Sequence, residues 1–293
     1  MTAEGQGGVL FVLHSRVPQD APAVVEARAC LVDRGIPVRL FQRVAADDRP
    51  GRFDGGWELP DEEVADTRLV VTFGGDGTFL HAARTAIRHD LPLLGVNLGR
   101  LGFLAWITLE EAPGALRDWA EGRTTIETRA TLTVELNGER NIAINEAALL
   151  KDPAANVIQL EVSSAGVEVG MFHADGVVVA TPTGSTAYAA SAGGPILDPS
   201  VSAMVLVPLN PHTLASRALV LPGDAPVRLL VDEATRLLLD GAANLDVPSH
   251  STIECSLDGP PLRVVRCPGT SDFYQQLREK MRWGEPLVRE GRR

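Results

Sequence analysis

Along the first hundred residues, apolar and polar positions follow two alternating patterns. Four short apolar runs predict buried strands: 8–14, 36–41, 68–73 and 93–97. The segments 21–33 and 79–88 carry apolar residues at helical spacing and predict helices, whereas 45–66 is rich in glycine, proline and acidic residues and predicts a loop. Strands and helices that alternate at this interval are typical of a doubly wound, mostly parallel α/β sheet.

The pattern changes beyond about residue 120, where short β-rich runs separated by turn residues replace the helices. These runs are 131–136, 157–164, 167–172, 177–180, 204–208, 227–231, 252–257 and 262–267. Such a series is typical of an all-β sandwich or barrel. The segment 271–283 then predicts a helix that Ser271 caps, with Phe273, Leu277 and Met281 on one face.

Length and composition agree with one large domain or two of ordinary size. The chain has 293 residues, of which 45% are hydrophobic and 22% charged, so it can bury a sizeable core without disulfides. Its only lysines are Lys151 and Lys280. A P-loop needs Gly-Lys-Ser/Thr, and a protein kinase needs a strand lysine after its glycine-rich loop; neither lysine stands in such a context. Both of these large ATP-using classes are therefore disfavoured.

Charge and cysteine content narrow the class further. A formal net charge of -11 without a run of Lys and Arg argues against nucleic acid or an anionic membrane as a partner. Cys30, Cys255 and Cys267 are an odd number without Cys-x-x-Cys spacing, and the chain begins without a signal-peptide pattern, so we expect reduced thiols in a cytoplasmic protein. The six histidines show no metal-ligand spacing, so we assign no metal directly to protein side chains.

The run Gly74-Gly75-Asp76-Gly77-Thr78 directly follows the third predicted strand. Glycines at a strand end let backbone N–H groups approach a ligand, and the following helix points its positive N-terminal end at the same place, which suits a polyphosphate. Asp76 inside such a loop suggests Mg²⁺ binding or proton abstraction from a nucleophile. The alternative is a tight turn with a helix-capping acid. A standard Rossmann dinucleotide fingerprint is not supported, because Leu80 stands where its third glycine would be.

Three further segments carry candidate ligand groups. The glycine-rich loop 95–103 follows the fourth strand and should line the same crevice as Asp76, unless it only connects two domains. Asn145 and Glu146 can hydrogen-bond ribose hydroxyls or a base edge, although such a pair is also common in solvated turns. The segment 173–195 is dense in hydroxyls that can recognise sugars and phosphates without fixed charge, and Tyr188 can stack on a base.

In the order GGDGT, GVNLGRLGFL, Asn-Glu, DGVVVATPTGSTAYAASAGGP and NPHTLASRALV, these motifs make the chain resemble the ATP-NAD kinase family over roughly residues 8 to 283. GGDGT alone also occurs in lipid kinases and phosphofructokinases; the TPTGSTAY segment with the downstream Asn-Pro-His-Thr-Leu is far more specific. The resemblance implies an α/β domain over 1–118, a β-sandwich NAD-binding domain over 119–270, and a C-terminal helix within 271–293 that packs back on the first domain.

The resemblance also implies an activity and a set of site residues. The activity is transfer of the γ-phosphate of ATP, or of inorganic polyphosphate, to the 2′-hydroxyl of the adenosine ribose of NAD, with Mg²⁺ or another divalent metal assisting. Asp76 is expected to accept the proton, inside a phosphate loop of Gly74, Gly75, Gly77 and Thr78. The expected NAD or nucleotide contacts are Asp76, Gly77, His81, Asn145, Glu146, His173, Asp175, Thr186, Ala187, Tyr188, Ala189, Ala190 and Ser191. A homodimer or homotetramer is expected.

Two departures from the family pattern concern NAD contacts. Many members carry Asp-Gly-Gln where this chain has Asp240-Gly241-Ala242, and Asn156 stands where relatives often place a basic or polar ligand residue. Two other functions remain open from the sequence. One is a lipid kinase that shares the GGDG loop, which the hydroxyl-rich segment disfavours; the other is a catalytically silent NAD(H)-binding regulator, which has no need of Asp76.

Overall fold

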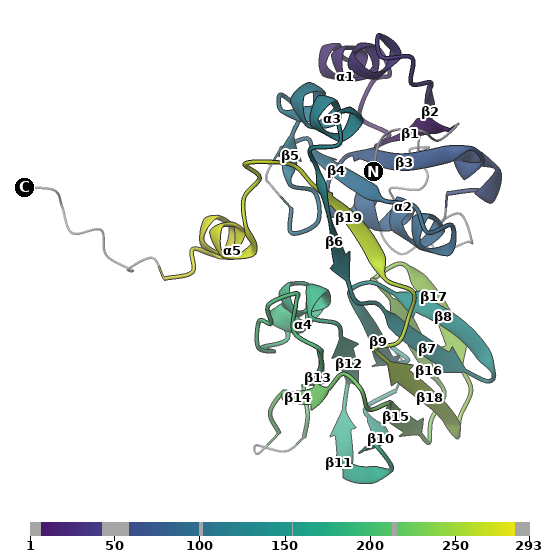
Figure 1. Cartoon of the computed structure of the whole chain (residues 1–293). Helices are drawn as coiled ribbons and strands as arrows, with labels where there is room; N and C mark the ends of the chain where they lie inside the picture. The colour runs from purple at the N-terminus through teal and green to yellow at the C-terminus, as the bar shows by residue number, and fades with distance from the viewer. Residues whose placement is uncertain (1–6, 43–58, 100–101, 154, 213–215, 285–293) are drawn as a thin grey trace, which may run out of the picture.

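The computed structural model describes residues 7–42, 59–99, 102–153, 155–212 and 216–284 (Figure 1). An α/β domain with a mostly parallel sheet stands above a β-sandwich in Figure 1, and the predicted fold class is confirmed. No helix of the described residues has the length and apolarity that crossing a membrane requires. The predicted loop 45–66 lies largely outside the described residues; its last part contains a short 3-10 helix, Asp61–Val64.

The first sheet has seven strands, in the order β2-β1-β3-β4-β19-β6 with β5 added beside β4. These strands are β1 (Gly8–Leu13), β2 (Val38–Gln42), β3 (Thr67–Phe73), β4 (Leu93–Asn97), β5 (Ile107–Thr108), β6 (Thr125–Arg129) and β19 (Leu262–Arg266). All pairs are parallel except β19 with β6. The carboxyl ends of β3 and β4 therefore lie at one edge, where their loops can form a common site.

Helices cover both faces of this sheet because successive strand residues point to opposite sides. Phe11 packs with the helices α1 (Pro22–Val32) and α3 (Ala112–Ala120), whereas its neighbour Leu10 packs with α2 (Asp76–Arg88). The helix α2 begins three residues before the predicted start, so Asp76 is its first residue. We did not predict α3, since nine residues that include a proline and a glycine give a weak helical pattern.

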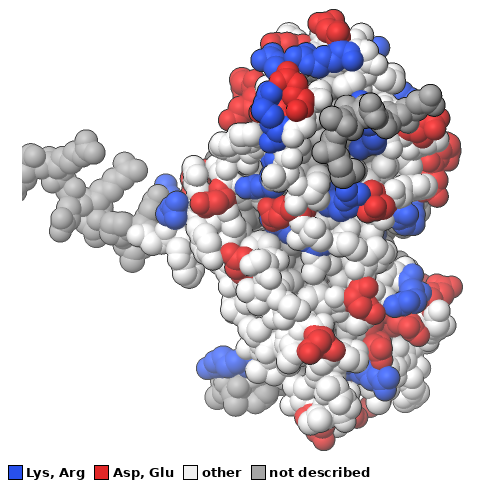
Figure 2. All heavy atoms as spheres, in the orientation of Figure 1, with Lys and Arg blue, Asp and Glu red and all other residues white. Residues whose placement is uncertain are grey.

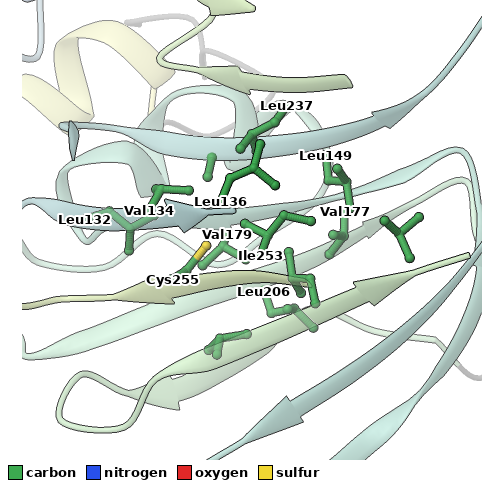
Figure 3. Close-up of a cluster of buried hydrophobic side chains, with 14 of the residues drawn as sticks. Leu132, Val134, Leu136, Leu149, Val177, Val179, Leu206, Leu237, Ile253 and Cys255 are labelled. Carbon is green, nitrogen blue, oxygen red and sulfur yellow. The ribbon is translucent and has the colours of Figure 1, made fainter. Parts of the chain in front are cut away.

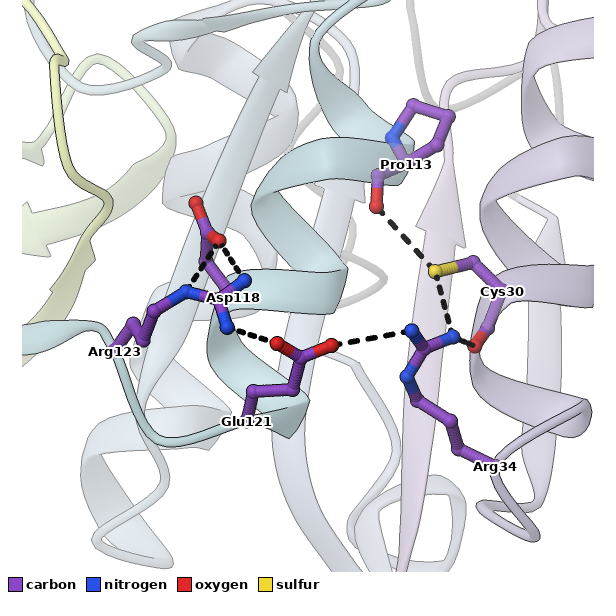
Figure 4. A network of polar contacts seen from close by, with 6 residues as sticks. All are labelled: Cys30, Arg34, Pro113, Asp118, Glu121 and Arg123. Carbon is purple, nitrogen blue, oxygen red and sulfur yellow. Dashed lines mark hydrogen bonds and ion pairs between the residues drawn. The ribbon is translucent and has the colours of Figure 1, made fainter.

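Polar contacts join α1 to α3 on the outer surface of the first domain (Figure 4). Cys30 donates its thiol proton to the carbonyl of Pro113, and Arg34 pairs with Glu121 at 3.2 Å. Arg123 contacts Glu121 as well, which extends the network. The partners of these ion pairs are substantially exposed, so they contribute little to stability, and the apolar contacts beneath them hold the two helices.

The second domain consists of two six-stranded sheets with antiparallel pairing. One has the order β11-β10-β15-β18-β7-β8 and the other β14-β13-β12-β9-β16-β17. Their strands are β7 (Leu132–Leu136), β8 (Glu139–Ala143), β9 (Glu146–Lys151), β10 (Ile158–Ser164), β11 (Val167–Ala174), β12 (Gly176–Ala180), β13 (Ala203–Leu209), β14 (Leu219–Pro222), β15 (Val227–Val231), β16 (Thr235–Leu239), β17 (Ala243–Val247) and β18 (Ser251–Ser256). Figure 3 shows side chains of both sheets in one core, among them Val134 and Ile253 from the first and Leu149 and Val177 from the second.

The chain crosses between the domains more often than the sequence pattern indicates. The run 262–267, counted among the sandwich strands, forms β19, which pairs with β4 and β6 in the first sheet. Alternation of polar and apolar residues predicts a strand but does not say which sheet it joins. The last helix, α5 (Phe273–Met281), has Asp272 as its N-cap instead of Ser271, because the Asp272 carboxylate accepts the N–H of Gln275 at 2.7 Å. Residues 285–293 of the predicted C-terminal helix region lie outside the described residues.

Candidate active site

The glycine loop forms the connection between β3 and α2. A side chain at Gly74 would come within 2.2 Å of the Thr78 hydroxyl, so only glycine allows the loop to close over that buried threonine. Gly75 is the residue before α2, and neither Gly75 nor Gly77 has another atom near the place of a β-carbon. Side chains of the described residues therefore leave space beside both glycines at the positive end of α2, and a helix N-terminus is the arrangement that binds phosphate.

The carboxylate of Asp76 is held by the loop that follows β4. It accepts the backbone N–H groups of Phe103 at 2.9 Å, Leu104 at 3.1 Å and Ala105 at 3.2 Å. A β-carbon at Gly102 would lie 1.8 Å from Asp76 Oδ1, so the loop can approach the carboxylate only with glycine there. The expected meeting of Asp76 with the loop 95–103 is thus confirmed for the described part; Arg100 and Leu101 lie outside it.

A second charged group reaches Asp76 from the far end of the sequence. Lys280 on α5 places its ammonium 3.8 Å from Asp76 Oδ2 and 4.3 Å from the centre of the Phe103 ring. Burial lowers the pKa of Lys280, and the charge of Asp76 opposes that effect. We did not predict a role for Lys280. The resemblance implies that the C-terminal helix packs back on the first domain, but spacing along the chain does not show which of its side chains reaches the glycine loop.

The Asn145-Glu146 turn is built around the carboxylate of Asp240. This side chain is 1% exposed and accepts the backbone N–H groups of Ile144 at 2.9 Å, Asn145 at 2.7 Å and Glu146 at 3.2 Å. Arg84 of α2 completes the arrangement with an ion pair of 3.0 Å to the same carboxylate. Asp240 therefore fixes the turn and connects it to the helix that begins with Asp76. We did not predict this role, because the family comparison drew attention to Ala242 and not to Asp240.

Glu146 is buried at the start of β9, and one of its carboxylate oxygens has no hydrogen-bond partner among the described residues. Burial and, to a smaller extent, the nearby charge of Asp240 raise the pKa of Glu146 to about 8, with the backbone N–H of Tyr188 acting in the opposite direction. At neutral pH the side chain is therefore largely protonated. A neutral carboxyl can donate a hydrogen bond as well as accept one, which suits recognition of a hydroxyl.

The hydroxyl-rich segment lies directly against this turn. Thr181 donates its hydroxyl to the carbonyl of Ile144 at 2.7 Å, and a β-carbon at Gly184 would lie 2.0 Å from the carbonyl oxygen of Asn145. The segment continues as a 3-10 helix, Thr183–Thr186, and the short helix α4 (Tyr188–Ser191). The structure thus brings Asn145 and Glu146 together with the predicted wall 186–191.

Most of these hydroxyls bond within the protein, however. Ser185 donates to the carbonyl of Pro182 at 2.6 Å, Thr186 to that of Thr183 at 3.1 Å, and Ser191 lies 3.5 Å from that of Ala187. These hydroxyls therefore close the segment's own turns. Each still has lone pairs that can accept a hydrogen bond, so their contact with a ligand stays a prediction. Tyr188 is different, because its side chain is 41% exposed and available for stacking.

The structure does not bring His173 and Asp175 to this group within one chain. Both lie before β12 at its Gly176 end, whereas the Asn145-Glu146 turn lies beside Ala180 at the other end, a strand length of about 15 Å away. Asp175 pairs with Lys151 at 2.8 Å, a contact that lowers its pKa. His81 is a buried residue of α2 whose ring lies beside Phe41. Among the described residues, no group of three His, Cys, Asp or Glu could hold a metal ion.

A glycine loop and helix N-terminus on a parallel sheet, together with a β-sandwich that carries the Asn145-Glu146 turn, are typical of a two-domain nucleotide-binding protein. The family model described as the ATP-NAD kinase N-terminal domain matches residues 57–124, and that of the ATP-NAD kinase C-terminal domain matches residues 144–266. The chain belongs to the ATP-NAD kinase family, and the predicted enzyme class is confirmed.

Relatives named NAD kinase cover most of the chain. The protein of Solibacter usitatus is 39% identical over 86% of this chain and 89% of its own length, and that of Treponema denticola is 34% identical over 94% and 96%. Two solved structures share the fold at 23% identity. The yeast NADH kinase complexed with NADH has a TM-score of 0.79, and the match covers 98% of this chain and 91% of the yeast chain. The NAD kinase from Archaeoglobus fulgidus in complex with ATP has a TM-score of 0.74, and the match covers 92% of this chain and 99% of the archaeal chain.

Proposed function

We propose that this chain transfers the γ-phosphate of ATP to the 2′-hydroxyl of the adenosine ribose of NAD and thereby forms NADP. The observation that carries the proposal is the position of Asp76, a carboxylate held by three backbone N–H groups at the first residue of α2. Family membership supports the reaction, and relatives are named for NAD or crystallised with NADH or ATP.

Each half of the site has a role in this reaction. The N–H groups of Gly75 and Gly77 bind phosphate oxygens at the N-terminus of α2, and the turn of Asn145 and Glu146 hydrogen-bonds the adenosine end of NAD. The 2′-hydroxyl attacks the γ-phosphorus and its proton passes to Asp76, while the bond to the β-phosphate oxygen breaks and ADP leaves. Among the described residues, Oδ2 of Asp76 accepts only the N–H of Phe103, so it keeps a lone pair for the substrate hydroxyl.

Magnesium would enter with the nucleotide. Mg²⁺ is commonly held by one or two carboxylates together with substrate phosphates, which does not require a cluster of three acidic side chains. When bound, it neutralises charge on the transferring group. A protein of net charge -11 needs that help. Charged side chains in Figure 2 are numerous over the first domain and sparse over much of the second, where the stretch from 176 to 216 has only Asp198. A cytoplasmic location and a homodimer or homotetramer remain predictions.

The test is NADP formation with NAD or NADH as acceptor, each crossed with ATP or polyphosphate as donor, in the wild type and in Asp76→Asn. We expect the variant to lose about 10²- to 10⁴-fold in turnover because the base is removed, while its circular dichroism and melting temperature show a folded protein. Asp246→Asn, an exposed change on the edge strand β17, is the matched control and should retain turnover.

Other outcomes separate the competing functions. Wild-type turnover in Asp76→Asn would exclude Asp76 as the base. NAD binding without NADP from any donor would favour a silent regulator, and phosphorylation of diacylglycerol without NADP would favour a lipid kinase. Full turnover in excess chelator would contradict the role given to Mg²⁺.

A further inference from the structure

The two lysines of this arginine-rich chain both lie against aspartates of the predicted site. Lys151 is 2.8 Å from Asp175, and Lys280 is 3.8 Å from Asp76. The first distance is a hydrogen-bonded pair. The second is close enough for attraction between charges but too long for a hydrogen bond, so Asp76 does not use the N–H donors of Lys280.

The helix α5 holds Lys280 at this place through contacts with both domains. Its N-terminus is capped by Asp272, and Phe273 lies beside Phe103 with ring centres 6.4 Å apart. Tyr274 hydrogen-bonds Asp198 of the second domain. In Figure 1, α5 stands apart from the helices that cover the first sheet. A helix anchored on the loop that seats Asp76 gives Lys280 a defined position instead of a free surface one.

The ammonium group of Lys280 lies beside the glycine loop, next to Asp76. Its side chain is 26% exposed and its ammonium lies over the Phe103 ring, an attractive contact that does not occupy a hydrogen-bond donor. No described residue accepts a hydrogen bond from its ammonium nitrogen. The three donors can therefore turn to an incoming acceptor beside Asp76, and a phosphate at the N-terminus of α2 brings such oxygens.

We propose that Lys280 is a further catalytic residue of this enzyme, which binds the terminal phosphate of the donor beside Asp76. This proposal rests on the proposed function. In the transfer step Lys280 neither gains nor loses a proton: the hydroxyl proton goes to Asp76, the new bond joins the 2′-oxygen to phosphorus, and ADP leaves. The lysine offsets repulsion between the Asp76 carboxylate and the negative phosphate, so its interaction concerns the donor and not NAD.

The experiment compares Lys280→Met and Lys280→Arg with Arg278→Met, which removes a positive charge from an exposed position of the same helix. Steady-state NADP formation is measured with ATP varied at saturating NAD, and with NAD varied at saturating ATP. We expect Lys280→Met to lose about 10- to 100-fold in kcat/KM for ATP, the size of one charge-assisted hydrogen bond, with the KM for NAD within about threefold of wild type. Lys280→Arg should recover most of the loss, and Arg278→Met should match wild type.

Calorimetric titration of ATP with Mg²⁺ into the protein, in the absence of NAD, separates this proposal from the proposed function. Weaker ATP binding by Lys280→Met would support the lysine's role even if the wild type formed no NADP, an outcome that would overturn only the proposed function. Unchanged ATP binding together with an unchanged kcat/KM for ATP would overturn the role of Lys280. A lower melting temperature with equal losses toward ATP and NAD, and no recovery in Lys280→Arg, would make it a structural residue and overturn the proposal as well.

Discussion

Replacing Glu146 by glutamine should change how the stability of this protein depends on pH. The side chain is 5% exposed, and burial together with the charge of Asp240 raises its pKa to about 8. In the unfolded chain a glutamate has a pKa near 4.5. The folded protein therefore keeps a proton that the unfolded chain releases across the interval between these two values.

The sign and size of the effect follow from this difference. Below about pH 4.5 the carboxyl is neutral in both states and its burial carries no ionisation cost. As pH rises the unfolded state is favoured by about 1.4 kcal/mol per pH unit, so about 5 kcal/mol of stability is lost by the time the pH passes the folded pKa near 8. Glutamine has a similar shape and does not titrate, so Glu146→Gln should lack this loss.

The assay is urea unfolding followed by circular dichroism at pH 5, 6, 7 and 8. We expect Glu146→Gln to gain stability relative to the wild type by nearly equal steps between pH 5 and 7, with a smaller step between pH 7 and 8 as the pH reaches the folded pKa. Glu135→Gln, at an exposed position of β7, is the matched control and should run parallel to the wild type. Parallel curves for Glu146→Gln and the wild type would refute the assignment of a protonated carboxyl at neutral pH.

Two further substitutions test how the two halves of the site are held. Gly102→Ala should lower turnover at least tenfold, because its β-carbon would lie 1.8 Å from Asp76 Oδ1 and must displace the loop. Gly114→Ala on α3, where a β-carbon meets open space, is the control and should leave turnover unchanged. Equal NADP-forming turnover in the two variants would contradict the close approach of Gly102 to Asp76. Asp240→Ala should cost about 3–5 kcal/mol in urea unfolding, because it leaves three backbone N–H groups and Arg84 without their buried partner, and a cost below about 1 kcal/mol would contradict that role.

Local pattern was sufficient for much of the fold. The alternation of strands and helices over 8–97 predicts the parallel sheet, and the strand runs after residue 120 predict the sandwich, because periods of 2.0 and 3.6 residues are properties of neighbouring residues. The glycine loop was also readable, since a strand end, three glycines and a helix start are consecutive. The same reasoning failed for β19, whose residues show a strand but not the sheet to which it belongs.

The sequence by itself determined the classes of element, the phosphate-binding character of the loop around Asp76 and, through its motifs, the family. Only the tertiary structure decided which groups surround these residues. It placed Lys280 beside Asp76, set Asp240 under the Asn145-Glu146 turn, and turned several hydroxyls of the segment 181–191 inward. The physical reason is that charge pairing, burial and the resulting proton affinity depend on which surfaces meet in space, and segments distant along the chain carry no local signal of that meeting.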